Sequence, residues 1–397
     1  MSFLTDFFDR SLVLHEQLRG KISVQNKLPI GSRDDLSLAY TPGVARPCEI
    51  ISEDPEAAYR LTSKGNSVAV ITDGSAVLGL GDIGPLASLP VMEGKALLFR
   101  EFAKIDAWPI CLDTKDPAKI IETCKVIAPS FGGINLEDIS APRCFEIEDA
   151  LQDLGIPVFH DDQHGTAIVL LAALINAAQV TEKKLNDLRV VVNGAGAAGT
   201  AIAKLISGIG VAGTEISPVG DVIICDSKGA ISRSRDGLSP EKIRLLEFSN
   251  KGNRSGTLKE VIKGADVFIG VSKGNVITTD DVKAMAKNSI ILAMANPTPE
   301  IMPEEAIRGG AAVVGTGRSD FANQVNNVLV FPGIFRGALD ARAPRINGEM
   351  KVAAALALAG AVDEISPENI LPHPLDRTVA PRIAKHVRAA AKASLKS

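Results

Sequence analysis

A glycine-rich hexapeptide at residues 194–199, GAGAAG, restricts the fold of this chain more than any other feature. It follows an apolar, strand-like run at 189–193 and opens a helix-like stretch at 200–206. Backbone N–H groups at the start of such a helix bind a pyrophosphate only where no side chain blocks the approach. We therefore expect a dinucleotide site here, rather than a glycine-rich turn that only packs tightly. Its cofactor-binding residues would be Gly194, Gly196, Ala197, Ala198 and Gly199.

Further apolar runs in the second half of the chain alternate with amphipathic, helix-like segments. Several of them lack polar alternation, which is typical of parallel strands that helices cover on both faces. The pattern predicts an α/β fold with a Rossmann-like, doubly wound parallel sheet. The expected strands after the first are at 221–225, 265–271, 289–295 and 311–316.

The first half of the chain shows the same βαβ rhythm and predicts a second α/β domain. A length of 397 residues also exceeds the about 250–300 residues at which a single core stops growing. The expected strands are at 67–72, 107–112 and 156–160, with helices at 94–105 and 144–154. We expect a first domain at 1–165, completed by C-terminal helices at 326–397, and the dinucleotide-binding domain at 166–325.

Composition excludes several classes of partner. The formal net charge is −4 and neither sign forms a long run, which argues against nucleic acid. The apolar segments at 166–180 and 352–362 are shorter than the about 20 residues of a membrane helix, so both are expected to be buried helices, the first beginning near Thr166. The five cysteines lack CxxC spacing and the N-terminus resembles no signal peptide, which favours a cytoplasmic location.

Two pairs of acidic residues lie at or near the ends of expected strands: Glu137-Asp138 in the strand-like segment GGINLEDI at 132–139, and Asp161-Asp162 directly after the strand at 156–160. Because side chains alternate along a strand, we expect one member of each pair to face a cleft. Either pair alone is more often a solvated turn, but two pairs ahead of a nucleotide domain favour function. Clustered carboxylates suit Mg²⁺ or Mn²⁺.

Two histidines, His160 and His164, flank the second acidic pair at a spacing that would suit zinc on a helix. We expect Gly165 to interrupt such a helix, and no glutamate follows the first histidine, so a zinc site is disfavoured. The histidines are expected to support the acids.

Asp226 ends the strand after the glycine-rich turn, where a carboxylate binds the ribose hydroxyls of NAD. Its distance along the chain from the glycines is longer than usual. Lys228, Arg233 and Arg235 follow it and suit either the 2′-phosphate of NADP or a solvated loop. The cofactor is therefore expected to be NAD or NADP.

Eight separated segments occur in this order along the chain: LAYTPGVA, TDGSAVLGLGDIGP, MEGKALLF, NLEDI, FHDDQHGTA, NGAGAAG, ANPTPE and GRSDFANQVNNVLVFPGIFRGALD. Together they resemble the malic enzymes, particularly the short bacterial type. The resemblance runs from about Asp35 to Leu375.

This resemblance implies oxidative decarboxylation of L-malate to pyruvate and CO₂ with reduction of NAD or NADP, as well as decarboxylation of oxaloacetate. It implies that Tyr40 is the general acid and Lys95 the general base, with Asp161 orienting the lysine. The implied metal ligands are Glu137, Asp138 and Asp162, and the implied substrate-binding or cofactor-binding amides are Asn296 and Asn327.

One position departs from the family pattern. The larger malic enzymes carry an arginine in the TDG loop that binds a substrate carboxylate, and Ala76 stands there in this chain. Arg318 or another cation would replace it. The resemblance also implies a homodimer, with the N-terminal helix as an interface element.

The residue types fit this chemistry. Desolvation beside a metal ion is expected to lower the pKa of Lys95 far enough for it to accept the proton of the C2 hydroxyl. Two rival functions are a metal-independent amino-acid dehydrogenase and a nucleotide-sensing module that has lost catalysis. The two acidic pairs argue against the first. Fold alone does not separate these three possibilities.

Overall fold

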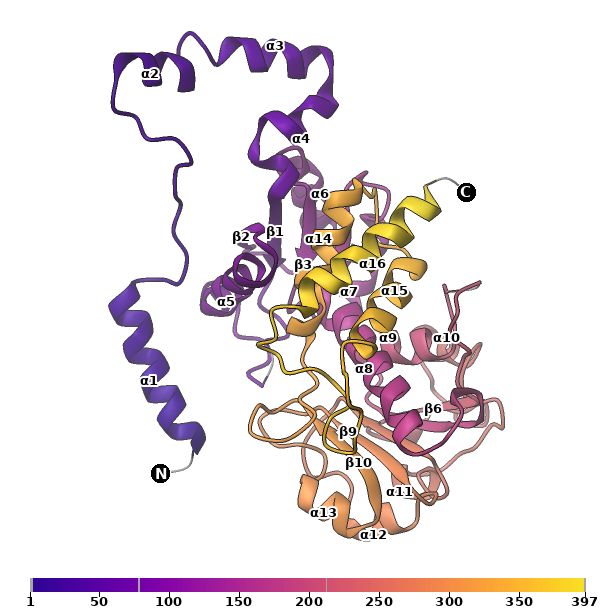
Figure 1. Cartoon of the computed structure of the whole chain (residues 1–397). Coiled ribbons are helices and arrows are strands. Elements are labelled where there is room, and N and C mark those ends of the chain that lie inside the picture. The colour runs from indigo at the N-terminus through magenta and orange to yellow at the C-terminus, as the bar shows by residue number, and fades with distance from the viewer. Residues whose placement is uncertain (1–2, 78, 212, 396–397) are drawn as a thin grey trace.

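The strands form two separate sheets in the computed structural model, which describes residues 3–77, 79–211 and 213–395 (Figure 1). The first sheet is entirely parallel, with the order β2-β1-β3-β4. Its strands are β1 (Ser67–Thr72), β2 (Asp106–Cys111), β3 (Gly133–Leu136) and β4 (Val158–His160).

The second sheet has the order β10-β9-β8-β5-β6-β7 and is parallel except where the short β7 pairs with β6. Its central strand, β5, has β6 on one side and β8 on the other, so the strand order reverses at the strand that precedes the glycine-rich turn. Open α/β sheets bind their ligands at this kind of reversal. The strands are β5 (Arg189–Asn193), β6 (Asp221–Asp226), β7 (Gly229–Ala230), β8 (Val267–Gly270), β9 (Ser289–Ala293) and β10 (Ala311–Thr316).

Helices connect the strands of both sheets. Between successive strands of the first sheet the helices are α5 (Pro85–Ala103), α6 (Pro117–Ile127) and α7 (Arg143–Ala150). Around the second sheet they are α9 (Ala197–Ile206), α10 (Pro240–Leu245), α11 (Leu258–Val261), α12 (Thr279–Lys283) and α13 (Pro303–Arg308). Short 3₁₀ turns lie at Pro55–Ala57, Ser63–Asn66, Ala128–Ser130, Leu185–Asp187 and Asn327–Leu329.

Helix α5 begins nine residues before the helix expected at 94. The expected start was too late, because neither Pro85 nor Pro90 excludes a helix at its position. Pro85 occupies the first turn of the helix, where no backbone N–H is needed, and the helix continues through Pro90.

The two sheets are joined by α8 (Asp161–Val180), which is almost wholly buried and packs against α9. At 20 residues it is the one helix in the described chain that is long and apolar enough to cross a membrane. However, 72% of its most apolar window is buried inside the protein, as expected for a core helix. The expected start of this helix near residue 166 was too late, because the polar sequence DDQHG forms its first turn.

The C-terminal helices α14 (Phe331–Ala341), α15 (Gly348–Ala359) and α16 (Val379–Ser394) pack against one another, and α14 also packs on α5. Phe331 and Phe335 meet Phe99 of α5 edge to face, with ring centroids 4.8 and 5.3 Å away. Helix α15 packs on α8. The domain boundaries at 165 and 325 remain a prediction.

The N-terminal helices α1 (Phe3–Leu18), α2 (Arg33–Ala39) and α3 (Ala45–Glu53) form an arm that stands away from both sheets, and α4 (Ala58–Leu61) leads back into β1 (Figure 1). Neither α2 nor α3 has a buried residue. Of the 27 large hydrophobic side chains that are exposed in the described chain, 14 lie on this arm, from Phe7 to Val44. The arm therefore presents a large apolar surface that this single chain does not cover.

Candidate active site

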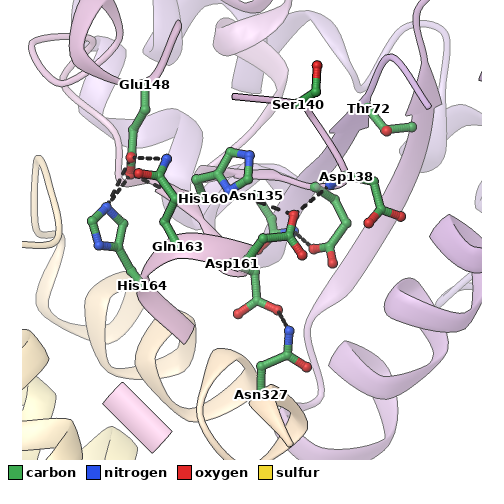
Figure 2. A network of polar contacts seen from close by, with 12 residues as sticks. Thr72, Asn135, Asp138, Ser140, Glu148, His160, Asp161, Gln163, His164 and Asn327 are labelled. Atoms are coloured by element: carbon green, nitrogen blue, oxygen red, sulfur yellow. Dashed lines mark hydrogen bonds and ion pairs between the residues drawn. The ribbon is translucent and has the colours of Figure 1, made fainter. Parts of the chain in front are cut away.

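The two acidic pairs meet because they follow neighbouring strands. Leu136 of β3 is aligned with His160 of β4, so the residues after both strands reach the same edge of the sheet (Figure 2). Glu137, Asp138 and Asp162 each place a carboxylate oxygen within 4.8 Å of the others. The backbone N–H of Asp138 also donates to Asp162 Oδ2 over 2.8 Å.

The expectation that only one member of each pair faces the site was wrong. Both pairs lie beyond the ends of their strands, where side chains no longer alternate. Asp138 has a left-handed backbone conformation, with φ of 53°, and Asp161 begins a helix. All four carboxylates consequently lie in one region.

This cluster is suited to a divalent cation. Burial, with repulsion between the carboxylates, raises the pKa of Asp138 to about 9, although Lys95 opposes the shift. Burial raises the pKa of Glu137 to about 7 and that of Asp162 to about 6. Asp138 Oδ2 is buried without a hydrogen-bond partner. Three oxygen donors of this kind match the ligands that Mg²⁺ and Mn²⁺ prefer.

Lys95 projects from α5 into the same cluster. Its Nζ lies 2.7 Å from Asp161 Oδ2 and 2.9 Å from Glu137 Oε1, and 4.1 Å from the centroid of the Phe331 ring. The expected lowering of its pKa is not what these contacts produce. Burial lowers the pKa of Lys95, but the charges of Asp161 and Glu137 outweigh it and raise the pKa above the ordinary value.

Asp161 is fully buried and makes two contacts through one oxygen. Its Oδ2 accepts one hydrogen bond from Lys95 Nζ and another, of 2.5 Å, from Asn327 Nδ2. Helix α8 continues through Gly165, contrary to our expectation that this glycine would interrupt it. A Cβ at Gly165 would lie 1.9 Å from Asp161 Oδ1, so glycine leaves the space that this carboxylate occupies.

The two histidines do not join the acids as ligands. In the part of the chain that the structure describes, the one candidate metal group is Glu137, Asp138 and Asp162, which contains neither histidine. His160 Nδ1 is 3.8 Å from Asp162 Oδ2, whereas His164 Nε2 is 2.9 Å from Glu148 Oε1. Nothing in the sequence pattern singled out Glu148, since it belongs to no motif.

The glycine-rich turn lies between β5 and α9, at the reversal of strand order. A Cβ at Gly199 would lie 1.8 Å from the carbonyl oxygen of Gly194, so close packing of the turn requires glycine. A Cβ at Gly196 would meet nothing within 4 Å, which leaves the N-terminus of α9 open to a ligand. This geometry fits a bound pyrophosphate.

Two family models match almost the whole chain. Residues 19–152 match the malic enzyme N-terminal domain, and residues 163–392 match the malic enzyme NAD-binding domain. The chain belongs to the malic enzyme family. The family and the α/β fold expected from the sequence are thereby confirmed.

Similar proteins include enzymes named for either dinucleotide. The bifunctional malic/malolactic enzyme of Bacillus subtilis is 56% identical over 387 residues, which are 96% of this chain and 92% of that protein. The NADP-dependent malic enzyme of Salmonella typhimurium is 48% identical over 96% of this chain and 52% of its own length. The crystal structure of the NAD-dependent malic enzyme from Thermotoga maritima superposes with a TM-score of 0.90 at 46% identity, covering 95% of this chain and 98% of that one.

In this member of the malic enzyme family, the carboxylate of Asp226 is paired with two cationic side chains of its own chain. Arg235 binds it through two nitrogens, at 2.8 and 2.6 Å, and Lys242 Nζ lies at 2.6 Å. Although burial opposes them, these hydrogen bonds hold the pKa of Asp226 well below its usual range. Arg233 instead donates to the backbone carbonyls of Leu246 and Asn250. The cofactor is NAD or NADP, and the role of Asp226 in binding it stays a prediction.

Ala76, which the resemblance aligns with a substrate-binding arginine, lies directly beside the candidate metal group, since its N–H donates to the carbonyl of Asp138 over 2.9 Å. The expected replacement, Arg318, has its nitrogens bound to Asp320, at 2.6 and 2.9 Å, and to the carbonyl of Pro297. Another arginine that no motif indicated, Arg143, is paired with Asp73 of the TDG loop at 3.0 Å.

Tyr40 is the one expected catalytic side chain that the structure does not bring to the cluster. It directly follows α2, on the arm that stands away from both sheets (Figure 1), and is 67% exposed. This separation could not be predicted from the sequence, because a motif shows the order of residues along the chain and not where an arm lies in the fold.

Proposed function

We propose that this protein catalyses the oxidative decarboxylation of L-malate to pyruvate and CO₂, with NAD or NADP as hydride acceptor, and that it also decarboxylates oxaloacetate. The observation that carries the proposal is the buried contact of Lys95 with two carboxylates, one of which belongs to the candidate metal group. Loops beside the two sheets also approach each other. A Cβ at Gly79 of the first domain would lie 3.7 Å from the carbonyl oxygen of Asn296 in the second.

Each residue of the cluster is assigned a role. Lys95 takes the proton of the C2 hydroxyl, and Asp161, itself held by Asn327, orients the lysine. A divalent ion held by Glu137, Asp138 and Asp162 would polarise the C2 oxygen. It would also neutralise the negative charge of Glu137, which in its absence stabilises the protonated form of Lys95. Asn296, Asn327 and Arg318 are proposed to contact malate or the nicotinamide side, since Arg318 and Asn296 flank the same Pro297 turn.

The proposal is tested by following the absorbance of the reduced nicotinamide with L-malate and Mn²⁺, in parallel with NAD and NADP. We expect reduction that excess EDTA abolishes and added Mn²⁺ restores, with labelled CO₂ released from C4-labelled malate. Reduction without labelled CO₂ and without metal dependence would indicate a simple dehydrogenase instead. Absence of reduction with either dinucleotide would favour the sensing module.

We propose further that the protein is a homodimer in which the arm of one chain reaches the site of the other. The many exposed apolar side chains of the arm support this, because such a surface is normally covered by a partner. The arm also carries Tyr40, our proposed general acid, directly after α2, whereas Lys95 belongs to α5 beside the first sheet. A partner's Tyr40 would then complete each site and protonate C3 of the enol product.

Mixed dimers test the exchange of Tyr40. Tyr40→Phe and Lys95→Ala are each expected to be nearly inactive, whereas their mixture after subunit exchange should regain about a quarter of the wild-type activity, since half of the dimers then hold one intact site. If Tyr40 and Lys95 instead act within the same chain, neither site of a hybrid dimer is intact, and the mixture stays inactive. A sedimentation mass equal to one chain would contradict the dimer itself.

The protein is also proposed to act in the cytoplasm. All five cysteines are unpaired, and burial raises the pKa of Cys124, Cys144 and Cys225 to about 12. Unpaired thiols of this kind are typical of a reducing compartment.

A further inference from the structure

The turn that carries Asp161 and Asp162 is held by a single carboxylate from another helix. Glu148 of α7 is buried and accepts three hydrogen bonds from this turn (Figure 2). Its Oε1 accepts from the backbone N–H of His160 over 3.2 Å. Its Oε2 accepts from Gln163 Nε2 and from His164 Nε2, each over 3.0 Å. These donors lie on both sides of the acidic pair, so Glu148 fixes the turn at its beginning and its end.

The hydrogen-bond chain continues to the C-terminal helices. Lys351 of α15 places Nζ 3.1 Å from His164 Nδ1. Because a lysine ammonium only donates, Nδ1 must accept, and the ring proton of neutral His164 lies on Nε2, facing Glu148. The contact with Lys351 therefore selects the tautomer that donates to Glu148.

Glu148 is suited to this task only as a carboxylate. Burial by itself would raise its pKa, but His164 and Lys351 outweigh burial and lower the pKa of Glu148 to about 2. All the groups that face it in the turn are donors. A glutamine at this position would present an NH₂ group to at least one of these donors and lose that hydrogen bond.

We propose that Glu148 is a positioning residue for the metal site, and that Lys351 assists it through His164. Glu148 acts on Asp162, a proposed metal ligand, and on Asp161, the proposed partner of Lys95, by fixing the turn from which both project. This inference rests on the proposed function, since it assigns a role toward the metal of that site. Groups beyond the direct ligands commonly set metal affinity by orienting those ligands.

The first test compares Glu148→Gln with Glu146→Gln, an exposed residue of the same helix that undergoes the same change of charge. Mn²⁺ binding to the folded, full-length protein is measured by electron paramagnetic resonance, without substrate. Glu148→Gln should weaken Mn²⁺ binding by about 10–100-fold, and Glu146→Gln should leave it unchanged. Unchanged Mn²⁺ affinity in folded Glu148→Gln would overturn the proposal.

A second pair of variants keeps the proposal testable if Glu148→Gln fails to fold. Lys351→Met removes the donor to His164, whereas Lys204→Met removes a lysine that lines the same cavity of about 330 Å³ and has no hydrogen bond to this network among the described residues. Lys351→Met should weaken Mn²⁺ binding and raise the Mn²⁺ concentration needed for half-maximal activity, with kcat at saturating Mn²⁺ much less affected. Equal Mn²⁺ affinities in the two lysine variants would overturn the role of Lys351. If the wild type itself binds no Mn²⁺, the proposed metal site fails rather than the role of Glu148 within it.

Discussion

Replacement of Lys95 by alanine is expected to lower kcat for malate oxidation by about 10²–10⁴-fold, the usual contribution of a general base. The proton of the C2 hydroxyl must leave before hydride is transferred, and Lys95 is the buried amine that contacts both Asp161 and Glu137. The loss should fall on kcat rather than on dinucleotide affinity, because the glycine-rich turn is unchanged.

Steady-state kinetics and a fluorescence titration with the reduced dinucleotide measure these two quantities separately. Lys119→Ala, which removes an exposed lysine from α6, is the matched control and should retain wild-type kinetics. A folded Lys95→Ala protein with wild-type kcat would remove Lys95 from the role of base.

The variant Asp138→Asn is expected to lose Mn²⁺ affinity by more than the about 10–100-fold typical of residues that only orient ligands. Activity should be lost at Mn²⁺ concentrations that saturate the wild type. Asparagine tolerates the left-handed backbone at this position, with φ of 53°, and has nearly the same shape as aspartate. The local structure should therefore survive the change.

Thermal unfolding gives an independent measurement of this effect. Because burial and the neighbouring carboxylates raise the pKa of Asp138 to about 9, removing its carboxyl should not lower the melting temperature in EDTA. Mn²⁺ should raise the melting temperature of the wild type and of the exposed control Asp153→Asn, but not of Asp138→Asn. An equal stabilisation of all three proteins would exclude Asp138 as a ligand.

The strands of the fold could be predicted closely from the sequence, because buried parallel strands are continuous apolar runs. β1 and β5 have the expected residues at both ends. The starts of α5 and α8 were harder to predict, since prolines and polar residues in a first turn look the same as a loop in the sequence.

The candidate site shows a similar division. The grouping of Glu137, Asp138 and Asp162 was predictable, because the ends of neighbouring parallel strands meet at one edge. The direction of the pKa shift of Lys95 was not, because it depends on two carboxylates that only the folded chain brings to the amine. Glu148 was missed for the same reason, since its contacts with the turn have no sequence signature.

Helix α8 has a consequence for how the two halves of the protein influence each other. Its first turn contains Asp161 and Asp162, and its buried body packs against α9, whose N-terminus follows the glycine-rich turn. The two regions are therefore connected through α8, which carries the acidic turn at its start and packs against α9 along its buried body. Any tilt of α9 against the first sheet must therefore be transmitted to the acidic turn or be absorbed by the loops around Gly79 and Asn296.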